Sequence, residues 1–176
     1  MVPSAAASAV PKPDPGATQG APFRAEALSM VLRTVAGIRT GEDVEDLRAY
    51  LMKLGDSAPP VHQTVVLACD NHGDERPTWT YVEADARTGT ARRRCLQCAT
   101  SVSVLDSAQR WTHPPMWSCA TCGQSIAEVV AGVSVPDGEH VDWLVLGVRC
   151  VECGRVEGLT DLVLPGLPLA AVLSQL

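Results

Sequence analysis

The sequence is poor in aromatic residues and has no long apolar run. It holds four Trp, two Tyr and one Phe among 176 residues, although 46% of its residues are hydrophobic. Any core must therefore be built mostly from Val, Leu and Ala, and a small aliphatic core stabilises a domain only weakly unless something else ties the chain together. No segment approaches the roughly eighteen consecutive apolar residues of a membrane-spanning helix, so we expect no membrane partner.

An excess of positive charge is also missing, since the formal net charge is −6. Strong non-specific binding to nucleic acid usually rests on a basic surface that releases counterions from phosphates. The charge balance therefore favours another protein as the partner and places nucleic acid second.

The N-terminal segment lacks the pattern of a secretory signal. Residues 1–16 have no continuous apolar stretch and are interrupted by four prolines, which disfavours export. We therefore expect a cytoplasmic protein. In that compartment thiols stay reduced, and closely paired cysteines are more often metal ligands than disulfides.

The cysteines, by contrast, follow one spacing throughout. All seven lie in pairs with two residues between the members, and the cysteine without a cysteine partner has a histidine at the same distance. A tight turn can aim both side chains of such a pair at one ion, while its backbone amides stabilise the thiolate charge. We call each pair with its turn a knuckle. The four knuckles are Cys69/His72, Cys95/Cys98, Cys119/Cys122 and Cys150/Cys153.

The residue that follows each knuckle supports the same interpretation. Gly73, Gly123 and Gly154 stand at this place, where a positive φ is commonly needed, whereas Ala99 follows the second knuckle. We therefore expect the second knuckle to be the least regular. In its ligand pairs and glycines, the segment 69–154 resembles the zinc-ribbon class, in which two knuckles on hairpins clamp one zinc ion.

Two pairings of the four knuckles are open. Sequential pairing gives one site with three thiolates and an imidazole and a second site with four thiolates. Interleaved pairing joins the first knuckle to the third. The closure of short hairpins favours the sequential arrangement. Iron is the main alternative metal for a four-thiolate site, but the histidine in the first site suits zinc better.

Four protein ligands for each ion leave no open coordination position, and closed zinc sites are structural. The chain also lacks the His-x-Glu element of zinc deaminases and the paired histidines of zinc proteases. The sequence therefore predicts a non-enzymatic protein with two structural zinc ions. The zinc-ribbon resemblance implies a protein-interaction or scaffold module. A redox switch that releases zinc when its thiolates are oxidised is a weaker alternative.

The second interpretation of function rests on arginine. Arg92, Arg93 and Arg94 abut the second knuckle, and many proteins of the zinc-ribbon class touch DNA or RNA through hairpin loops. This resemblance implies a transcription-associated protein that binds nucleic acid through the arginine cluster. In a strand, Arg92 and Arg94 would share one face while Arg93 takes the other, and a solvated strand face is the commoner explanation of such a run.

The large aromatic residues and one further histidine have less specific roles. Trp79, Trp111, Trp117 and Trp143 lie on or beside expected strands. We expect most of them in the core, because so aliphatic a protein needs its large side chains inside. His113 is a reserve ligand in case the histidine of the first knuckle does not bind.

The pattern outside the knuckles predicts an α+β fold. Residues 1–22 are rich in Ala, Pro, Ser and Gly and predict a disordered tail. Residues 23–56 predict a short helical hairpin, because apolar residues recur at helical spacing from about 24 to 38 and again from Val44 to Leu54.

The boundaries of the second helix have sequence signals of their own. Thr40 and Asp43 resemble a capping box at its start, and Gly55 suits a left-handed C-terminal cap.

The period then changes towards two, which predicts two zinc-ribbon-like antiparallel β units at 61–111 and 112–165. A short helix is expected at 166–176. The expected strands are Val61–Ala68, Trp79–Val82, Val102–Leu105, Ile126–Val135 and Val141–Val148.

Overall fold

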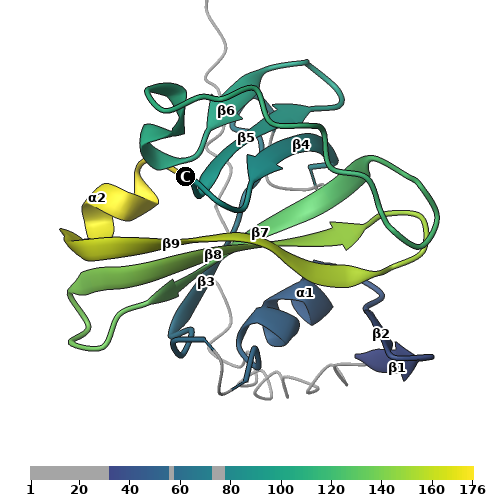
Figure 1. Ribbon diagram of the computed structural model, residues 1–176, viewed down its shortest axis with the longest axis horizontal. Coiled ribbons are helices and arrows are strands. Elements are labelled where there is room, and N and C mark those ends of the chain that lie inside the picture. The colour runs from purple at the N-terminus through teal and green to yellow at the C-terminus, as the bar shows by residue number, and fades with distance from the viewer. Residues whose placement is uncertain (1–31, 56–57, 73–77) are drawn as a thin grey trace, which may run out of the picture.

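The computed structural model describes residues 32–55, 58–72 and 78–176. In this part of the chain the fold is α+β: seven strands form one antiparallel sheet, and two α-helices accompany it (Figure 1). The strands of this sheet are β3 (Gln63–Val66), β4 (Thr80–Asp85), β5 (Thr90–Cys95), β6 (Ser101–Ser103), β7 (Ile126–Ser134), β8 (His140–Cys150) and β9 (Val156–Pro168). The helices are α1 (Val44–Leu51) and α2 (Leu169–Leu173), with a 3-10 helix, η1, at Leu105–Ala108.

β7 is the central strand. One of its edges pairs with β8, and its other edge is shared by two strands. β4 pairs with Ile126 and Ala127, whereas β3 pairs with the stretch from Val130 to Val133. The strand order is β6-β5-β4-β7-β8-β9, with β3 also beside β7. β3 and β4 therefore both pair with β7, and the first knuckle lies in the segment of chain that connects them.

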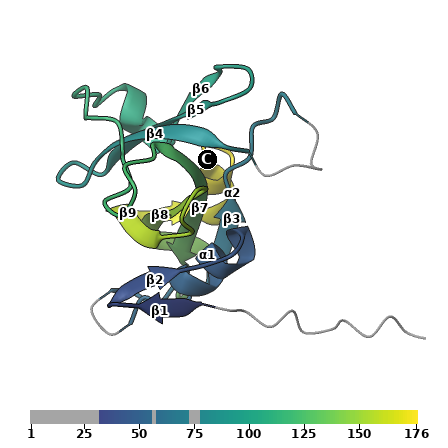
Figure 2. The same ribbon diagram turned by 90° about the vertical axis from the view of Figure 1, so that its right-hand side faces the viewer.

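Both faces of the β7–β8 pair are buried. On one face, Leu47 and Leu51 of α1 belong to one apolar cluster with Val130. On the other face, Val129 belongs to a larger cluster that includes Val82 of β4. Figures 1 and 2 show the same layers, with β4 to β6 over one side of β7 to β9 and α1 on the opposite side. Because β7 packs against apolar side chains on both of its faces, it is apolar along nearly its whole length.

α1 confirms the second predicted helix, but its N-cap differs from the expected one. Asp43 is the N-cap residue, and its carboxylate accepts hydrogen bonds from the amides of Glu45 (3.0 Å) and Asp46 (3.1 Å). Such a contact satisfies amides that have no partner inside the helix. Thr40 ends the preceding strand instead of capping the helix.

The C-terminal end of α1 also lies earlier than expected. Its C-cap is Met52, so Gly55, with a φ of +85°, lies beyond the helix. A glycine in β8 allows the helix to approach the sheet, because a Cβ at Gly147 would lie 2.8 Å from Leu51 Cδ2 and 3.1 Å from Leu47 Cδ1.

The first predicted helix is wrong in its described part. Residues 33–40 form a two-stranded hairpin of β1 (Arg33–Val35) and β2 (Ile38–Thr40). Ala36 and Gly37 connect the strands with φ values of +50° and +79°. Positive φ at both central residues gives a two-residue turn whose twist matches that of the strands. The predicted tail at 1–22 and the start of the predicted helix lie outside the described residues.

Most of the other expected elements are present. The five predicted strands are found as β3, β4, β6, β7 and β8, and α2 lies within the predicted C-terminal helix. β5 and β9 were not among the predicted strands. The strands expected in the units 61–111 and 112–165 belong to one sheet, because β4 of the first pairs with β7 of the second.

The turn between β7 and β8 carries an ion pair that titrates. Asp137 Oδ1 accepts from the amides of Glu139 and His140, and its Oδ2 lies 2.8 Å from His140 Nδ1. The pKa of His140 is raised above its ordinary value of 6.5, chiefly by the hydrogen bond to Asp137 and then by its charge. The pKa of Asp137 is lowered below 3.8 by backbone hydrogen bonds and by His140.

We expect the substitution Asp137→Asn to return the pKa of His140 towards 6.5, as measured by NMR titration of the imidazole. Because the folded pKa of His140 is raised, its contribution to stability is complete below 6.5 and is lost as the pH rises through the folded value. The contribution of Asp137 is lost as the pH falls below 3.8. An unchanged His140 titration in the variant would contradict this account.

Candidate metal centres

The first cluster combines the first and second knuckles. Cys69 and His72 follow β3, whereas Cys95 ends β5 and Cys98 lies in the turn after it. The ligand atoms of these four residues all lie within 4.8 Å of one another. Cys69 and Cys95 are buried, and Cys98 is exposed. The structure thus brings together four residues that are far apart in the sequence.

A buried nitrogen in this cluster has no partner. His72 Nε2 makes no hydrogen bond with any residue that the structure describes. A buried polar atom that is left unpaired destabilises the fold, and most such atoms have a partner. Coordination to an ion held by the three neighbouring sulfurs would satisfy this nitrogen. The donor set of three thiols and one imidazole therefore fits a metal.

The second cluster combines the third and fourth knuckles. Cys119 and Cys122 precede β7, whereas Cys150 ends β8 and Cys153 precedes β9. Their sulfurs also lie within 4.8 Å of one another. The grouping is therefore the sequential one that was predicted, and the interleaved pairing is wrong.

Sulfur separations within the clusters match the size of a tetrahedral zinc site. Cys69 Sγ lies 3.6 Å from Cys98 Sγ in the first cluster, and Cys119 Sγ lies 3.5 Å from Cys153 Sγ in the second. An ion about 2.3 Å from each sulfur in tetrahedral geometry places the sulfurs roughly 3.8 Å apart. Small increases in the distances between the sulfur atoms would give the ion this geometry.

The second, third and fourth knuckles have the same backbone turn, whereas Gly73, which follows the first knuckle, lies outside the described residues. In each, the residue after the second cysteine has a positive φ, and its amide donates to the carbonyl of the first cysteine. These bonds run from Ala99 to Cys95 (3.0 Å), from Gly123 to Cys119 (2.8 Å) and from Gly154 to Cys150 (3.0 Å). The φ values are +59° for Ala99, +76° for Gly123 and +71° for Gly154. The second knuckle thus has the regular turn, with alanine in a place that favours glycine.

We expect the substitution Ala99→Gly to stabilise the protein by about 0.5–1 kcal/mol. A left-handed conformation costs a residue with a Cβ about 1–2 kcal/mol, and the extra freedom of glycine in the unfolded chain offsets about 0.4–1 kcal/mol of the gain. Denaturant unfolding of the metal-loaded protein measures the difference. A loss of stability would mean that the Ala99 side chain makes contacts that outweigh the backbone strain.

Ionisation of the thiols also favours a bound cation. The hydroxyl of Thr100, 3.2 Å from Cys98 Sγ, is the main cause that lowers the pKa of Cys98 to about 5. In the second cluster, burial first and then the neighbouring cysteines raise the pKa of Cys153 to about 12. Four thiols packed this closely do not all ionise by themselves, and a divalent cation would allow them to do so.

Polar residues around the first cluster were not found by the sequence analysis. Asn71 Nδ2 donates to Thr100 Oγ1 (2.8 Å), and the amide of Cys69 donates to Thr78 Oγ1 (2.8 Å). These bonds hold the knuckle turns in place around the ligands. Threonine and asparagine are common in turns, so nothing in their spacing marked them as supporting residues.

The arginine cluster is divided by the strand, as alternation predicts. Arg93 points inward and is 6% exposed, and it donates to the carbonyl of Ala68 (2.6 Å). Arg92 is paired with Glu83 at 2.6 Å. The predicted contact of Arg93 with nucleic acid is therefore wrong, because its guanidinium is buried. Arg94 is the most exposed of the three arginines.

The other predicted residues lie outside the clusters. His113 is exposed and belongs to neither cluster. Trp117 and Trp143 are buried, at 8% and 5% exposure, as expected for core residues. Trp79 is 49% exposed, so the expectation of a core position is wrong for this residue.

The fourth knuckle is covered by the segment that leads into α1. The amide of Gly41 donates to the carbonyl of Gly154 (2.9 Å), and Arg149 Nε donates to the carbonyl of Gly41 (2.9 Å). Arg149 also forms a buried ion pair with Glu128 at 2.7 Å. This segment therefore rests directly on the second cluster.

Comparison with protein-family models, with curated proteins and with solved structures finds no match for this chain. Among the residues that the structure describes, neither helix has the length and apolar character that crossing a membrane requires.

Proposed function

We propose that this protein is a non-enzymatic module in which each cluster holds one structural zinc ion, and that it acts by binding another protein. The observation that carries the proposal is the grouping of eight Cys and His ligands into two sets of four. Four protein ligands complete a tetrahedral shell, so neither ion would retain a position for a substrate or a reactive water.

Zinc is favoured over iron by the ligand set of the first cluster. Three sulfurs and an imidazole are a common structural zinc shell, and the histidine is less suited to iron. The partnerless nitrogen of His72 supports its role as the fourth ligand. The two metals would replace a large aromatic core, which this sequence lacks.

The proposal of a binding role, as opposed to an enzymatic one, rests on the same shells. If both coordination shells are complete, the ions can only hold the knuckle turns in place and cannot bind a substrate. A rigid sheet with its turns fixed by metal offers a surface for recognition. A role in nucleic-acid binding has less support, because Arg93 is buried and Arg92 is paired with Glu83.

Native mass spectrometry of freshly purified protein, with elemental analysis, tests the proposal. We expect two zinc ions for each chain. Cys98→Ser and Cys122→Ser should each reduce the content to one ion, since they remove an exposed ligand from different clusters. Ser118→Ala, next to a ligand but outside both clusters, is the matched control and should keep two ions. Protein that carries no metal, or iron in place of zinc, would overturn the proposal.

A further inference from the structure

The outward side of β4 and β5 carries a group of side chains that the metal clusters do not use. Tyr81 pairs with Arg94 across the two strands, and the amide of Leu96 donates to the carbonyl of Trp79 at 3.0 Å. Alternate residues of a strand share a face, and directly opposed residues lie on the same side. Trp79, Tyr81, Arg94 and Leu96 therefore form one surface, which we call the Trp79 face.

Apolar area gathers on this face. Trp79 is 49% exposed and Leu96 is 36% exposed. Met116 is 45% exposed and forms an isolated antiparallel β-bridge with Glu83. Because Glu83 lies on the same side of β4 as Tyr81, Met116 lies on this side as well. Scattered exposed apolar residues need no explanation, but Trp79 and Leu96 are direct neighbours, and adjacent exposed apolar side chains mark a site of interaction.

The arginines on this side differ in their pairing. The Arg92 guanidinium lies 4.4 Å from the centre of the Trp111 ring and forms an ion pair with Glu83. The Arg94 guanidinium lies 5.2 Å from the centre of the Tyr81 ring, and it forms no ion pair with any residue that the structure describes. Among the described residues, Arg94 therefore has no acidic partner for its positive charge, and it lies beside the exposed Trp79.

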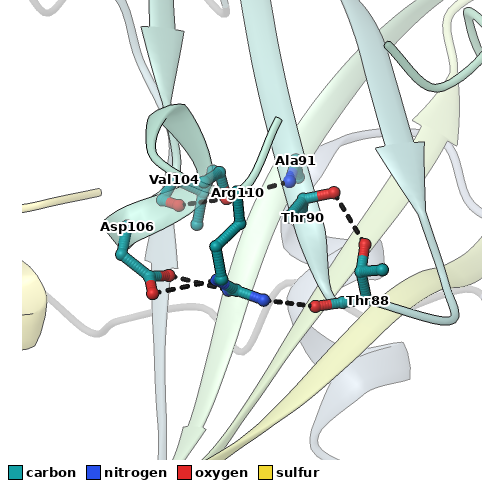
Figure 3. Close-up of polar contacts among 7 residues, drawn as sticks. Thr88, Thr90, Ala91, Val104, Asp106 and Arg110 are labelled. Atoms are coloured by element: carbon teal, nitrogen blue, oxygen red, sulfur yellow. Dashed lines mark hydrogen bonds and ion pairs between the residues drawn. The ribbon is translucent and has the colours of Figure 1, made fainter. Parts of the chain in front are cut away.

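The face is held in a fixed shape from two sides. Leu96 lies between Cys95 and Cys98, so an ion in the first cluster would fix it next to Trp79. Trp111 follows Arg110, which donates to both carboxylate oxygens of Asp106 (2.7 and 2.9 Å) and to the carbonyl of Thr88 (2.7 Å) (Figure 3). A rigid surface loses little conformational freedom when a partner binds.

We propose that the Trp79 face is the docking surface for a protein segment that places an acidic side chain on Arg94 and an apolar side chain between Trp79 and Leu96. The proposal rests on the proposed function and names the surface and the partner's chemistry. Tyr, Trp, Met and Arg are the residue types enriched in the cores of protein interfaces, and they dominate binding energy there. An acidic side chain of the partner complements the Arg94 guanidinium, which has no ion pair within the described part of the chain.

The same features disfavour a nucleic acid on this face. A phosphate backbone needs several free cations, whereas Arg94 is the one arginine of the three that is both exposed and unpaired within the described residues. The carboxylate of Glu83 beside Arg92 would repel phosphate. Trp79 and Tyr81 could stack on bases, but stacking without several free cations along the phosphate backbone supplies only part of such binding.

The test is a selection of phage-displayed random 12-residue peptides against the zinc-loaded full chain, followed by titration of synthetic selected peptides. We expect peptides that combine Asp or Glu with Leu, Phe or Trp. Trp79→Ala should weaken their binding about 30-fold, and Arg94→Glu should weaken it at least about tenfold. Two controls carry matched changes away from the face: Arg87→Glu, in the turn after β4, and Val163→Ala, in β9, which is 77% exposed. Both should bind like the native chain.

Zinc content measured on the same samples separates the two proposals. If two ions are bound but no peptide is selected, or if Trp79→Ala and Arg94→Glu bind as tightly as the controls, the docking proposal is overturned and the metal proposal stands. Selection of basic peptides also overturns it. Binding of labelled single-stranded DNA that is lost in Arg94→Glu, without peptide binding, would assign the face to nucleic acid. Absence of zinc would overturn the metal proposal itself.

Discussion

Removal of both metals is expected to unfold residues 61–165. A structural zinc ion contributes about 10–16 kcal/mol of apparent free energy, whereas whole domains are stable by about 5–15 kcal/mol. The first cluster joins the turn after β3 to the end of β5, and the second joins the turn before β7 to the turn between β8 and β9. Both sets of connections would be lost together. The apolar clusters are mainly aliphatic and would not hold the sheet alone.

Circular dichroism and tryptophan fluorescence, recorded during titration with a strong chelator, measure this effect. We expect the β signal to disappear and the emission of the buried Trp117 and Trp143 to shift to the red. The same chelator saturated with zinc beforehand is the control, and it should change neither signal. If elemental analysis shows complete loss of metal while the spectrum stays native, the metals do not hold the fold.

The second large effect is expected for Gly154→Ala, which should destabilise the metal-loaded protein by about 2–4 kcal/mol. Gly154 has a φ of +71°, and a Cβ there would lie 2.5 Å from the carbonyl oxygen of Gly41. The left-handed backbone costs alanine about 1–2 kcal/mol, part of which is offset in the unfolded chain, and the clash with backbone adds about 1–3 kcal/mol. The segment leading into α1 must then move away from the second cluster.

Gly123→Ala is the matched control for this prediction. Gly123 occupies the same place in the third knuckle with a φ of +76°, and a Cβ there would meet nothing within 4 Å. Its substitution should therefore cost only the backbone strain, about 1 kcal/mol. Denaturant unfolding of both variants at equal zinc content gives the comparison. Equal losses of stability would mean that the contact with Gly41 does not constrain the fold.

The metal clusters were the most predictable part of the molecule, because ligand chemistry restricts both residue type and spacing. Two ligands separated by two residues already specify a turn, and the glycines after three of the knuckles specify its handedness. The sequential grouping followed from short hairpins that return the chain. By contrast, the supporting contacts of Asn71 and Thr100 depend on the turns being placed side by side, and no local pattern encodes them.

The elements predicted wrongly or missed have identifiable physical reasons. The apolar spacing before residue 38 fits a helix, but Ala36 and Gly37 adopt positive φ, which a hairpin turn needs and a helix does not tolerate. β9 contains Gly158, Pro165 and Gly166, which are unfavourable inside a strand. They are tolerated because β9 lies at the edge of the sheet and its pairing with β8 has register shifts.

Side-chain exposure was harder to predict than secondary structure. The alternation of Arg92, Arg93 and Arg94 followed from the strand period, but which side faces the core depends on the strands above and below. Trp79 was expected inside because the chain has few large side chains, and it lies on the outer side of β4 instead. The outer surface of this sheet is therefore not dictated by composition.

The division of one edge of β7 between β3 and β4 has a consequence for the order of folding. β7, β8 and β9 follow one another in the chain and pair in the same order, so their contacts close short loops. The pairing of β4 with β7 spans β5, β6 and η1 and closes a much longer loop, which is entropically costly and slow. The two metal clusters do not share this difference, because 29 residues separate Cys69 from Cys98 and 28 separate Cys122 from Cys150. We therefore expect the β7–β9 meander to form first during folding and β4 to join β7 last.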